Sequence, residues 1–349
     1  MGSGGTVLQW FRSYLADRVQ KVVLGDSSSD PWRLRHGVPQ GSILSLMLFN
    51  IYMKPLGEVV RRSGLRSQQY ADDTQLYLSF STNPGVAVTV LNLCLDSIMV
   101  WMRVNKLRLN PGKSAVLLVG APPDRLKGHF PALDGITLPL KDRVHSLGVL
   151  LDPSLSLEAQ VDSVSTGAFL QLRKRYQLRP YLDERSLAAI THALVTTRLY
   201  CNALYVGQPL KTVRRLQLAQ NRAARLVSGA AARTHISPVL KNLHWLPVAA
   251  RAQFKVLTLT YKALNGLGPG YLKDRLLPYE PACPPRSGQE ALLKVPSLKE
   301  VRGMACRNRA FSAVAPQLWN ALPIEICLAP TLLAFRCKAK TFLFSQHFN

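Results

Sequence analysis

The sequence predicts an α+β protein, with a strand hairpin early in the chain and a long run of helices after it. Following the adjacent pair Asp72-Asp73, apolar and polar residues alternate in the pattern of a half-buried strand. Apolar residues recur at helical spacing over residues 86–104 and again from residue 154 onward. The chain has 349 residues, of which 47% are hydrophobic, so it can bury the cores of one to three domains.

The amino-terminal segment predicts a helix followed by a small hairpin. Residues 6–24 carry apolar side chains at roughly helical spacing and run into a strand at residues 22–24. Residues 25–31 form a polar turn, and residues 32–35 are the expected returning strand.

A loop and a buried helix come next. Two glycines and a proline mark residues 36–42 as a loop, and its last residue, Ser42, is suited to cap a helix. The helix over residues 43–53 is apolar on most sides, which predicts that it is buried. Pro55 is expected to end or kink this helix.

Two adjacent aspartates stand at the centre of the predicted hairpin, in the run Tyr70-Ala71-Asp72-Asp73. Strands disfavour aspartate, so the pair is expected at the tip of the hairpin. Two carboxylates held this close repel each other unless a cation or hydrogen-bond donors lie between them. Magnesium is a natural partner because it binds carboxylates together with substrate phosphates. Taken alone, the dipeptide favours a turn with two solvated aspartates, because turns are rich in aspartate.

Helices and short strands alternate over the middle of the chain. The helix over residues 86–104 presents Leu91, Leu95, Ile98 and Met102 on one face. Further elements are a turn at 110–113, a strand at 116–119, a proline-containing loop region at 120–143 and a strand at 147–151.

The carboxy-terminal half predicts a series of helices. The first begins after residue 154, buries one apolar face and ends at Arg173-Lys174-Arg175, the second spans 184–206, and the third spans 210–228 and is closed by Gly229. On the third helix, Arg214, Arg222 and Arg225 share one face, which predicts either an ordinary solvated surface or contact with a nucleic-acid backbone. Residues 234–349 form a distinct module with a helix at 248–265, a proline-rich connector at 278–285 and an aromatic-rich tail.

The charge is large and unevenly distributed. The net charge is +24, with 17 Lys+Arg and 13 Asp+Glu in residues 1–172, and 27 Lys+Arg and 7 Asp+Glu in residues 173–349. The second half therefore carries a net charge of +20, which indicates a nucleic-acid partner. No helix pairs a basic face with a strongly lipophilic one and the longest apolar run is short, so no membrane partner is expected.

Cysteine usage and the first residues indicate the compartment. None of the six cysteines forms a C-x-x-C pair, so a zinc ribbon or a redox motif is not supported. The start of the chain has no signal-peptide pattern. We expect reduced cysteines and an intracellular protein, in the nucleus and cytoplasm, that is not secreted.

Blocks along the whole chain resemble the reverse transcriptases of non-long-terminal-repeat (LINE-type) retrotransposons, most closely the jockey and chicken-repeat group. The resemblance begins with Gly37-Val38-Pro39-Gln40-Gly41-Ser42, an apolar helix and Tyr70-Ala71-Asp72-Asp73. The other matching blocks are Trp10–Leu15, Thr74–Tyr77, Trp101-Met102, Asn105–Asn110, Leu147–Val149, Leu243–Pro247 and Leu318–Pro323. Each block is moderately specific, and their order and spacing together are strongly specific.

The resemblance implies a right-hand polymerase fold and RNA-directed DNA synthesis. Residues 1–150 would form partial fingers and an incomplete palm, residues 151–233 a helical thumb, and residues 234–349 a carboxy-terminal extension. The partners would be an RNA template and a DNA primer, or an RNA–DNA hybrid, with Arg214, Arg222 and Arg225 on the nucleic-acid backbone. The oligomeric state is left open.

The resemblance also assigns roles at the reaction centre. Two Mg²⁺ ions serve the family, one lowering the pKa of the primer 3′-hydroxyl and the other holding the triphosphate and the leaving pyrophosphate. Asp72 would be a metal ligand with Asp73 as its weaker partner, beside Tyr70-Ala71 in the nucleotide site. Pro39-Gln40-Gly41 would lie near the template base and incoming nucleotide. Leu147-Gly148 would belong to the primer grip.

Lys113 has two readings. By resemblance it occupies the position of a lysine that donates a proton to pyrophosphate. The alternative is a solvated lysine in the turn at residues 110–113.

Two departures from the family pattern affect the expected activity. The family's first metal-binding aspartate lies on a strand upstream of the segment that matches Trp10, and residues 1–9 contain no acidic residue. One carboxylate pair does not bridge two ions, so we expect an amino-terminally truncated domain with little or no polymerase activity by itself. Ser45-Leu46-Met47 also lacks the proline that the family usually has at this point of the helix.

Three functional hypotheses follow. The first is a reverse transcriptase fragment that is inactive alone, so that enzyme status stays open. The second is a non-catalytic RNA- or DNA-binding protein derived from a retrotransposon. The third is a translated remnant without a selected role.

Overall fold

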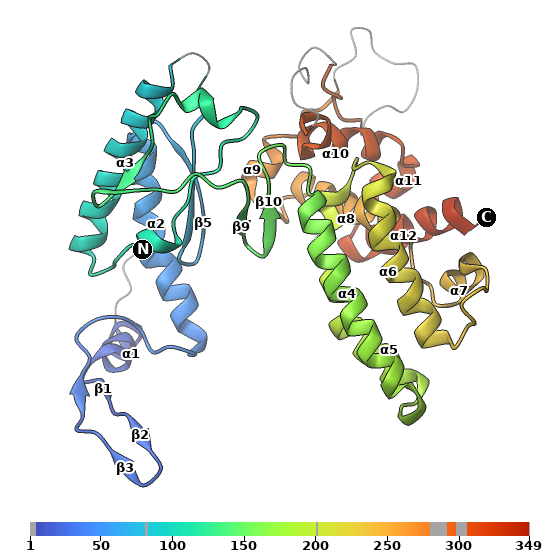
Figure 1. Ribbon diagram of the computed structural model, residues 1–349, viewed down its shortest axis with the longest axis horizontal. Helices are drawn as coiled ribbons and strands as arrows, with labels where there is room; N and C mark the ends of the chain where they lie inside the picture. The colour runs from blue at the N-terminus through green and yellow to red at the C-terminus, as the bar shows by residue number, and fades with distance from the viewer. Residues whose placement is uncertain (1–4, 81–82, 200–201, 280–291, 298–305, 349) are drawn as a thin grey trace. The chain divides into compact units, whose positions relative to one another are not determined.

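The computed structural model describes residues 5–80, 83–199, 202–279, 292–297 and 306–348. These residues divide into two compact units (Figure 1). Unit 1 comprises the chain up to Val116 together with Pro122–Lys141, and unit 2 comprises Leu117–Ala121 together with the chain from Asp142 onward. Both units mix helices with short strands or turns, so the α+β prediction is confirmed.

Unit 1 is built on two long helices, α2 and α3, together with short antiparallel strand pairs. Its elements are α1 (Thr6–Leu15), β1 (Val19–Gln20), β2 (Val23–Leu24), β3 (Ser27–Ser28), β4 (Trp32–Arg33), α2 (Ile43–Arg62), β5 (Arg66–Tyr70), β6 (Asp73–Tyr77), α3 (Pro84–Val104), β7 (Ala132–Leu133) and β8 (Ile136–Thr137). The strands form antiparallel pairs, β1 with β4, β2 with β3, β5 with β6 and β7 with β8.

The core of unit 1 lies between α2 and α3. Leu56 and Val60 of α2 are fully buried against Cys94 and Ile98 of α3. The predicted apolar face of the helix over residues 86–104 is confirmed, because its members are buried or partly buried in this core. Leu76 of β6 packs on the same cluster, which holds the β5–β6 hairpin against the two helices.

Helix α2 differs from its prediction in two ways. It does not end at Pro55 but continues to Arg62, because Met53, Leu56 and Val60 pack into the core on either side of the proline. Its first turns are not buried: Ile43 is 91% exposed, and Leu46, Met47 and Ile51 are exposed as well. The apolar composition of this half therefore marks an uncovered face rather than a core helix.

The amino-terminal strands also pair differently from expectation. The segment 22–24 does not pair with 32–35; instead β2 turns back on β3, and β4 pairs with β1, with Val19 opposite Arg33. Two nested two-residue ladders form in place of one hairpin because the turn closes at Gly25, whose φ of 60° is favourable for glycine. The side chains of β1 to β4 are all exposed.

Unit 2 is mainly helical. Its strands and α-helices are β9 (Val144–Ser146), β10 (Val149–Leu151), α4 (Glu158–Leu178), α5 (Glu184–Leu194), α6 (Leu210–Ser228), α7 (Ile236–Asn242), α8 (Val248–Leu264), α9 (Gly270–Lys273), α10 (Phe311–Asn320), α11 (Ile324–Cys327) and α12 (Leu332–Phe348). Helices α4 and α6 pack side by side through Ala168, Leu172, Ala219 and Ala223. Helices α8, α10 and α12 enclose a second core around Phe335.

Several predictions in unit 2 are confirmed. The third helix begins at Leu210 and ends at Ser228, and Gly229 adopts the left-handed conformation that stops it. The helix expected over 248–265 is α8. The connector at 278–285 lies almost wholly outside the described residues.

Other predictions are wrong at specific residues. The helix expected over 184–206 stops at Leu194 and is followed by short 3₁₀ turns. The strand expected over 116–119 is reduced to one bridge between Val116 and Leu140. Helix α4 does not end at the basic run but continues to Leu178, because Arg175 turns inward and bonds Gln171.

Two sequence blocks of the carboxy-terminal module pack against other elements, Leu243–Pro247 and Leu318–Pro323. Trp245 is buried, and the carbonyl of Leu246 accepts hydrogen bonds from Gln220 and Arg251, both at 2.8 Å. The side chain of Asn320 bonds the N–H and the carbonyl of Leu293 at 2.9 and 2.8 Å. Both blocks therefore join elements that are distant in sequence.

Among the described residues, two helices are long and apolar enough to cross a membrane by length and composition, α2 and α3. Core helices of soluble proteins meet the same criterion, and these two pack against each other.

Candidate functional site

The two aspartates lie at the tip of the β5–β6 hairpin, as predicted. Tyr70 pairs with Asp73, so Ala71 and Asp72 form a two-residue turn. Ala71 has a φ of 53°, in the left-handed region that costs an L-residue about 1–2 kcal/mol. Such strain is often found at functional turns. The fold thus holds two neighbouring carboxylates at one strained tip.

The hairpin has a buried face and an open face. Ser67, Gln69, Thr74 and Leu76 are half-buried toward the helices, while Asp72 and Asp73 are exposed. Gln69 lies against α2, with its side-chain oxygen 3.9 Å from where a Cβ on Gly57 would be. A Cβ at position 57 would thus be in ordinary van der Waals contact with Gln69.

The loop over residues 36–42 is anchored from the amino-terminal segment. Arg18 donates to the carbonyl of Gly37 at 2.7 Å, and the hydroxyl of Tyr14 contacts the hydroxyl of Ser42. Ser42 caps α2 by accepting from the N–H of Ser45 at 3.2 Å, which confirms the predicted cap. Gly41 has a φ of 83°, a conformation that favours glycine.

The loop and the hairpin lie at different elements of unit 1. Gln69 of the hairpin meets α2 at Gly57, fourteen residues beyond the first residue of the helix, Ile43. Among the described residues, no hydrogen bond joins Pro39-Gln40-Gly41 to Asp72. Lys113 lies in a 3₁₀ turn, Pro111–Lys113, and is exposed, so the expected turn is present.

The carboxylate pair fits one metal ion better than two. Asp72 and Asp73 supply oxygen ligands of the kind that magnesium prefers, and their exposure leaves room for water and phosphates. In the part of the chain that the structure describes, no group of three or more His, Cys, Asp or Glu side chains is placed to hold a metal. The donor set is thus incomplete for two ions.

The segment Leu147-Gly148 forms a hairpin tip rather than the start of a strand. Val149 pairs with Ser146, and the φ values of Leu147 and Gly148 are 48° and 78°. Two successive positive φ values are the signature of a type I′ turn. A leucine at the first central position of the turn does not suggest this turn type from the sequence. Leu147 is half exposed at this tip.

The three arginines of α6 have different environments. Arg214 is exposed. Arg222 lies over the ring of Phe169, 5.4 Å from its centroid. Arg225 is only half-exposed and donates to the carbonyl of Thr234 at 3.0 Å, which ties it to the chain after the helix.

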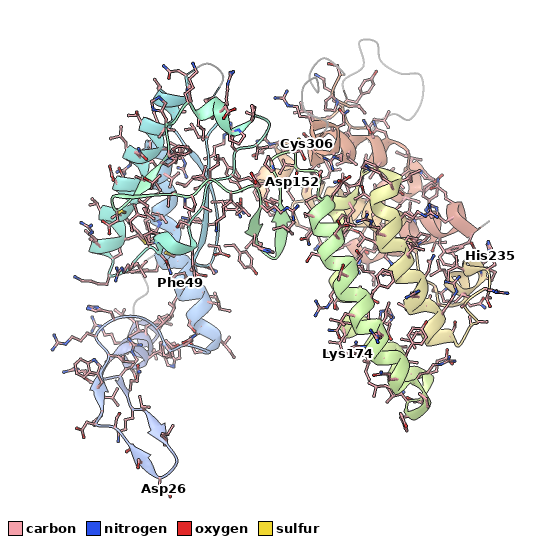
Figure 2. All side chains as sticks on the ribbon, in the orientation of Figure 1. Asp26, Phe49, Asp152, Lys174, His235 and Cys306 are labelled. Atoms are coloured by element: carbon pink, nitrogen blue, oxygen red, sulfur yellow. The ribbon has the colours of Figure 1, made fainter. Side chains whose placement is uncertain are left out.

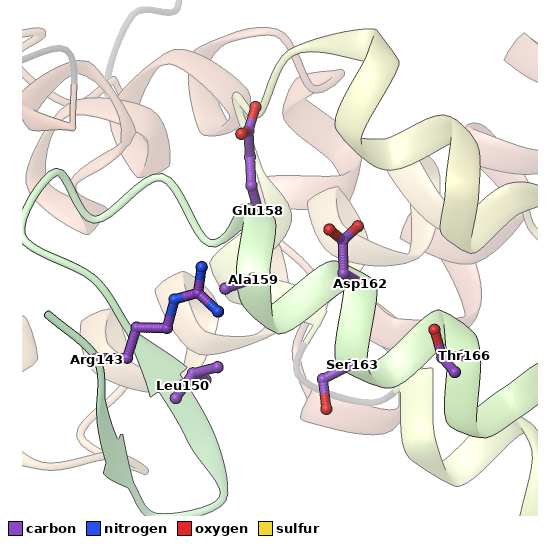
Figure 3. Close-up of a pocket in the computed structure, with 7 residues that line it drawn as sticks. All are labelled: Arg143, Leu150, Glu158, Ala159, Asp162, Ser163 and Thr166. Atoms are coloured by element: carbon purple, nitrogen blue, oxygen red, sulfur yellow. The ribbon is translucent and has the colours of Figure 1, made fainter.

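A surface pocket of about 510 Å³ lies between the β9–β10 hairpin and the start of α4 (Figure 3). Arg143 reaches toward α4 from the hairpin side. The two carboxylates of this pocket, Glu158 and Asp162, are already paired with Lys211 and Arg215 of α6. The pocket is therefore a polar recess next to a helix seam rather than a site with free ligands.

Asp152 is a structurally important residue that the sequence pattern did not single out (Figure 2). It accepts hydrogen bonds from the N–H groups of Ser154, Ser156 and Leu157, each at 3.0 Å, and from the hydroxyls of both serines. Burial raises the pKa of this carboxyl, but the hydrogen bonds outweigh it and hold the pKa below its usual value. The Asp-Pro-Ser spacing, typical of an Asx turn, is the signal that indicates it.

Asp152→Asn is expected to lower the free energy of unfolding by about 1 kcal/mol at pH 7, the size of a lost cap. The folded-state pKa of Asp152 is lowered, so its stabilisation is full above the unfolded pKa near 3.8 and is lost as the pH falls through the folded value. Urea unfolding of both proteins at pH 7 and pH 3 measures this. An equal difference at the two pH values would contradict it.

Part of the chain is similar in sequence to known proteins. Residues 4–151 match the family model described as reverse transcriptase (RNA-dependent DNA polymerase). A Drosophila melanogaster protein, the probable RNA-directed DNA polymerase from transposon BS, is 27% identical over 234 residues, covering 62% of this chain and 25% of that protein. The corresponding protein from transposon X-element, of the same organism, is 25% identical over 230 residues and is covered to 24%.

The chain thus spans about a quarter of the length of the curated relatives it matches. The matched family segment contains the Asp72-Asp73 hairpin, both core helices of unit 1 and the β9–β10 hairpin. Residues 4–151 are therefore similar to the reverse transcriptase (RNA-dependent DNA polymerase) family, and the chain resembles RNA-directed DNA polymerases encoded by Drosophila melanogaster transposons.

Proposed function

We propose that this chain is the template–primer-binding part of a LINE-type reverse transcriptase and that it does not polymerise by itself. The observation that carries the proposal is the exposed pair Asp72-Asp73 on a two-residue hairpin inside the matched segment 4–151. The hairpin with α2 and α3 acts as the palm, residues 5–42 as part of the fingers, and α4 to α6 as the thumb. Nucleic acid is the substrate, and Mg²⁺ is the cofactor.

The remaining roles follow from position. Tyr70 and Ala71 adjoin the carboxylates, and Pro39-Gln40-Gly41 contacts the template base and incoming nucleotide from the loop before α2. Lys113 is the candidate proton donor to pyrophosphate. Leu147-Gly148, at the tip of the β9–β10 hairpin, contacts the primer.

The proposal that this chain does not polymerise by itself rests on the number of metal ligands around Asp72 and Asp73. In-line phosphoryl transfer by two ions needs ligands that bridge both, which the described residues do not supply around Asp72 and Asp73. The test is primer extension on poly(A) with an oligo(dT) primer and Mg²⁺. We expect no product above background, and extension that disappears in Asp72→Ala would overturn the proposal of inactivity while confirming the site.

A second candidate is a non-catalytic nucleic-acid-binding protein, favoured by the net charge of +20 over residues 173–349. Both candidates bind nucleic acid, and only the first takes part in DNA synthesis. The two are distinguished by repeating the primer-extension assay, on the same hybrid, with a longer polypeptide that supplies a third carboxylate. Primer extension by that polypeptide supports the polymerase module, and no extension supports the binding protein. Failure to bind any RNA or DNA at low salt would exclude both.

Arg214→Ala is expected to weaken binding to an RNA–DNA hybrid and to reduce the slope of log K against log salt by about 1, because one phosphate contact is lost. Fluorescence anisotropy between 50 and 200 mM salt, about the range over which such slopes are read, measures this. The matched control is Arg103→Ala, which removes the same charge from an exposed ion pair with Asp134 in unit 1. Equal slopes for Arg214→Ala and the unchanged protein would place Arg214 outside the contact.

A further inference from the structure

The seam between α4 and α6 begins with neutralised charges. Lys211 lies 3.3 Å from Glu158, and Arg215 pairs with Asp162 one turn further along. From the first ion pair to the second, the residue numbers rise on both helices, so α4 and α6 run parallel. At this end each cation of the seam has a carboxylate partner.

The other end of the seam has a different chemistry. Arg222 lies over Phe169, and the hydroxyl of Tyr176 donates to the carbonyl of Arg222 at 3.4 Å. The positions Glu158, Asp162, Phe169 and Tyr176 follow one face of α4, so the contacts change along that face from acidic to aromatic.

Carboxylates are scarce around this end. Residues 163–241 contain 13 Lys+Arg and only two acidic residues, Asp183 and Glu184. Asp183 is used to cap α5, accepting from the N–H of Ser186 at 2.9 Å. Within the described ranges, the ion pairs found involve none of the cations at the carboxyl ends of the two helices, which are Arg173, Lys174, Arg179, Arg222 and Arg225. Lys174 projects from α4 in Figure 2.

Helix dipoles account for only part of this charge. Cations commonly gather at helix C-termini, and Arg179 reaches the end of α6, where its guanidinium occupies the space beside Gly229. Two helix ends together amount to about one negative charge, which the five cations exceed. Arg175 adds a sixth positive charge just beneath, since it is 94% buried and its hydrogen bonds to described residues are both to Gln171.

Two exposed tyrosines lie among these cations. Tyr176 is 44% exposed and Tyr181, in the 3₁₀ turn Arg179–Tyr181 that follows α4, is 83% exposed. An aromatic ring in water contributes little to folding, whereas rings beside arginines form the platforms on which proteins stack unpaired bases. In a duplex the base faces are already stacked on one another and are not available to such rings.

We propose that the carboxyl ends of α4 and α6 bind single-stranded nucleic acid, with phosphates held by Arg173, Arg179 and Arg222 and bases stacked on Tyr176 and Tyr181. The surface deepens the proposed function, since it rests on nucleic acid as the partner, but it requires neither Asp72 nor a metal ion. This surface offers phosphate and base contacts to an unpaired strand. The amino-terminal half of the seam does not, because its cations are already paired with carboxylates.

The test is binding of the full chain to a fluorescein-labelled oligo(U) single strand and to the matching RNA duplex. Tyr181→Ala is expected to weaken single-strand binding about tenfold, within the range for loss of one stacked base, and to leave duplex binding within twofold. Tyr181→Phe keeps the ring and is expected to bind normally. Tyr271→Ala, at an exposed tyrosine of α9, is the matched control and is expected to have no effect.

The outcomes separate the two proposals. Single-strand binding that Tyr181→Ala does not change, with circular dichroism showing a folded protein, overturns the stacking surface and leaves the polymerase proposal intact. Equal loss for single strand and duplex also overturns it, because a phosphate contact alone would explain that result. Absence of binding to either nucleic acid overturns both proposals.

Discussion

Phe335→Ala is expected to lower the free energy of unfolding of unit 2 by about 3–5 kcal/mol, the usual cost of truncating a buried phenylalanine. Phe335 of α12 is fully buried. Its ring stacks on Tyr261 at 4.4 Å and on Trp319 at 5.7 Å between centroids, so its loss opens a cavity between three helices. Urea unfolding followed by tryptophan fluorescence measures the change.

The control is Leu333→Ala, two residues earlier on the same helix and 71% exposed, which is expected to change stability by less than about 0.5 kcal/mol. Similar effects of the two substitutions would show that α12 is not held by this core. The block Leu318–Pro323 would then need an explanation other than packing against α12.

The prediction from sequence was most successful where one apolar face decides an element. The helix over 86–104 was identified through Leu95, Ile98 and Met102, and all three are buried. Periodicity reports the direction of burial, which a helix cannot change without exposing its whole apolar face. The third helix of unit 2, over 210–228, was bounded correctly for the same reason and because Gly229 favours a left-handed stop.

Prediction was incomplete where tertiary contacts override local preference. Of the two outcomes expected at Pro55, a helix end does not occur, because Leu56 and Val60 are fully buried beyond it and α2 continues. Leu147 adopts a positive φ that its side chain disfavours, since the pairing of Ser146 with Val149 leaves only two residues for the turn. Neither outcome is encoded in the residue itself.

The candidate site was only partly predictable. The adjacent aspartates and the hairpin were found because their pattern is local. The position of Asp72 relative to Pro39-Gln40-Gly41 depends on where along α2 the hairpin packs, and Gln69 lies beside Gly57 of that helix. The ion pairs that neutralise half of the α4–α6 seam join residues about fifty positions apart, and no spacing rule reveals them.

The Asp72-Asp73 tip is expected to bind a divalent ion weakly by itself and more tightly when a nucleoside triphosphate is present. Two exposed carboxylates supply only part of a coordination shell, and triphosphate oxygens add the missing ligands. Titration with Mn²⁺, a paramagnetic substitute for Mg²⁺, should broaden the backbone amide signals of residues 70–74. Adding the triphosphate should shift the midpoint to lower Mn²⁺ concentration by at least about tenfold, by linkage.

Asp72→Asn is expected to abolish this broadening, because one neutral amide leaves a single carboxylate at the tip. Asp26→Asn is the matched control: Asp26 is a lone aspartate in the two-residue turn between β2 and β3, where Leu24 pairs with Ser27. Broadening at both tips to the same extent would mean that any exposed aspartate in a hairpin turn suffices. The adjacency of Asp72 and Asp73 would then have no special role, and the metal site would have to be sought elsewhere in the protein.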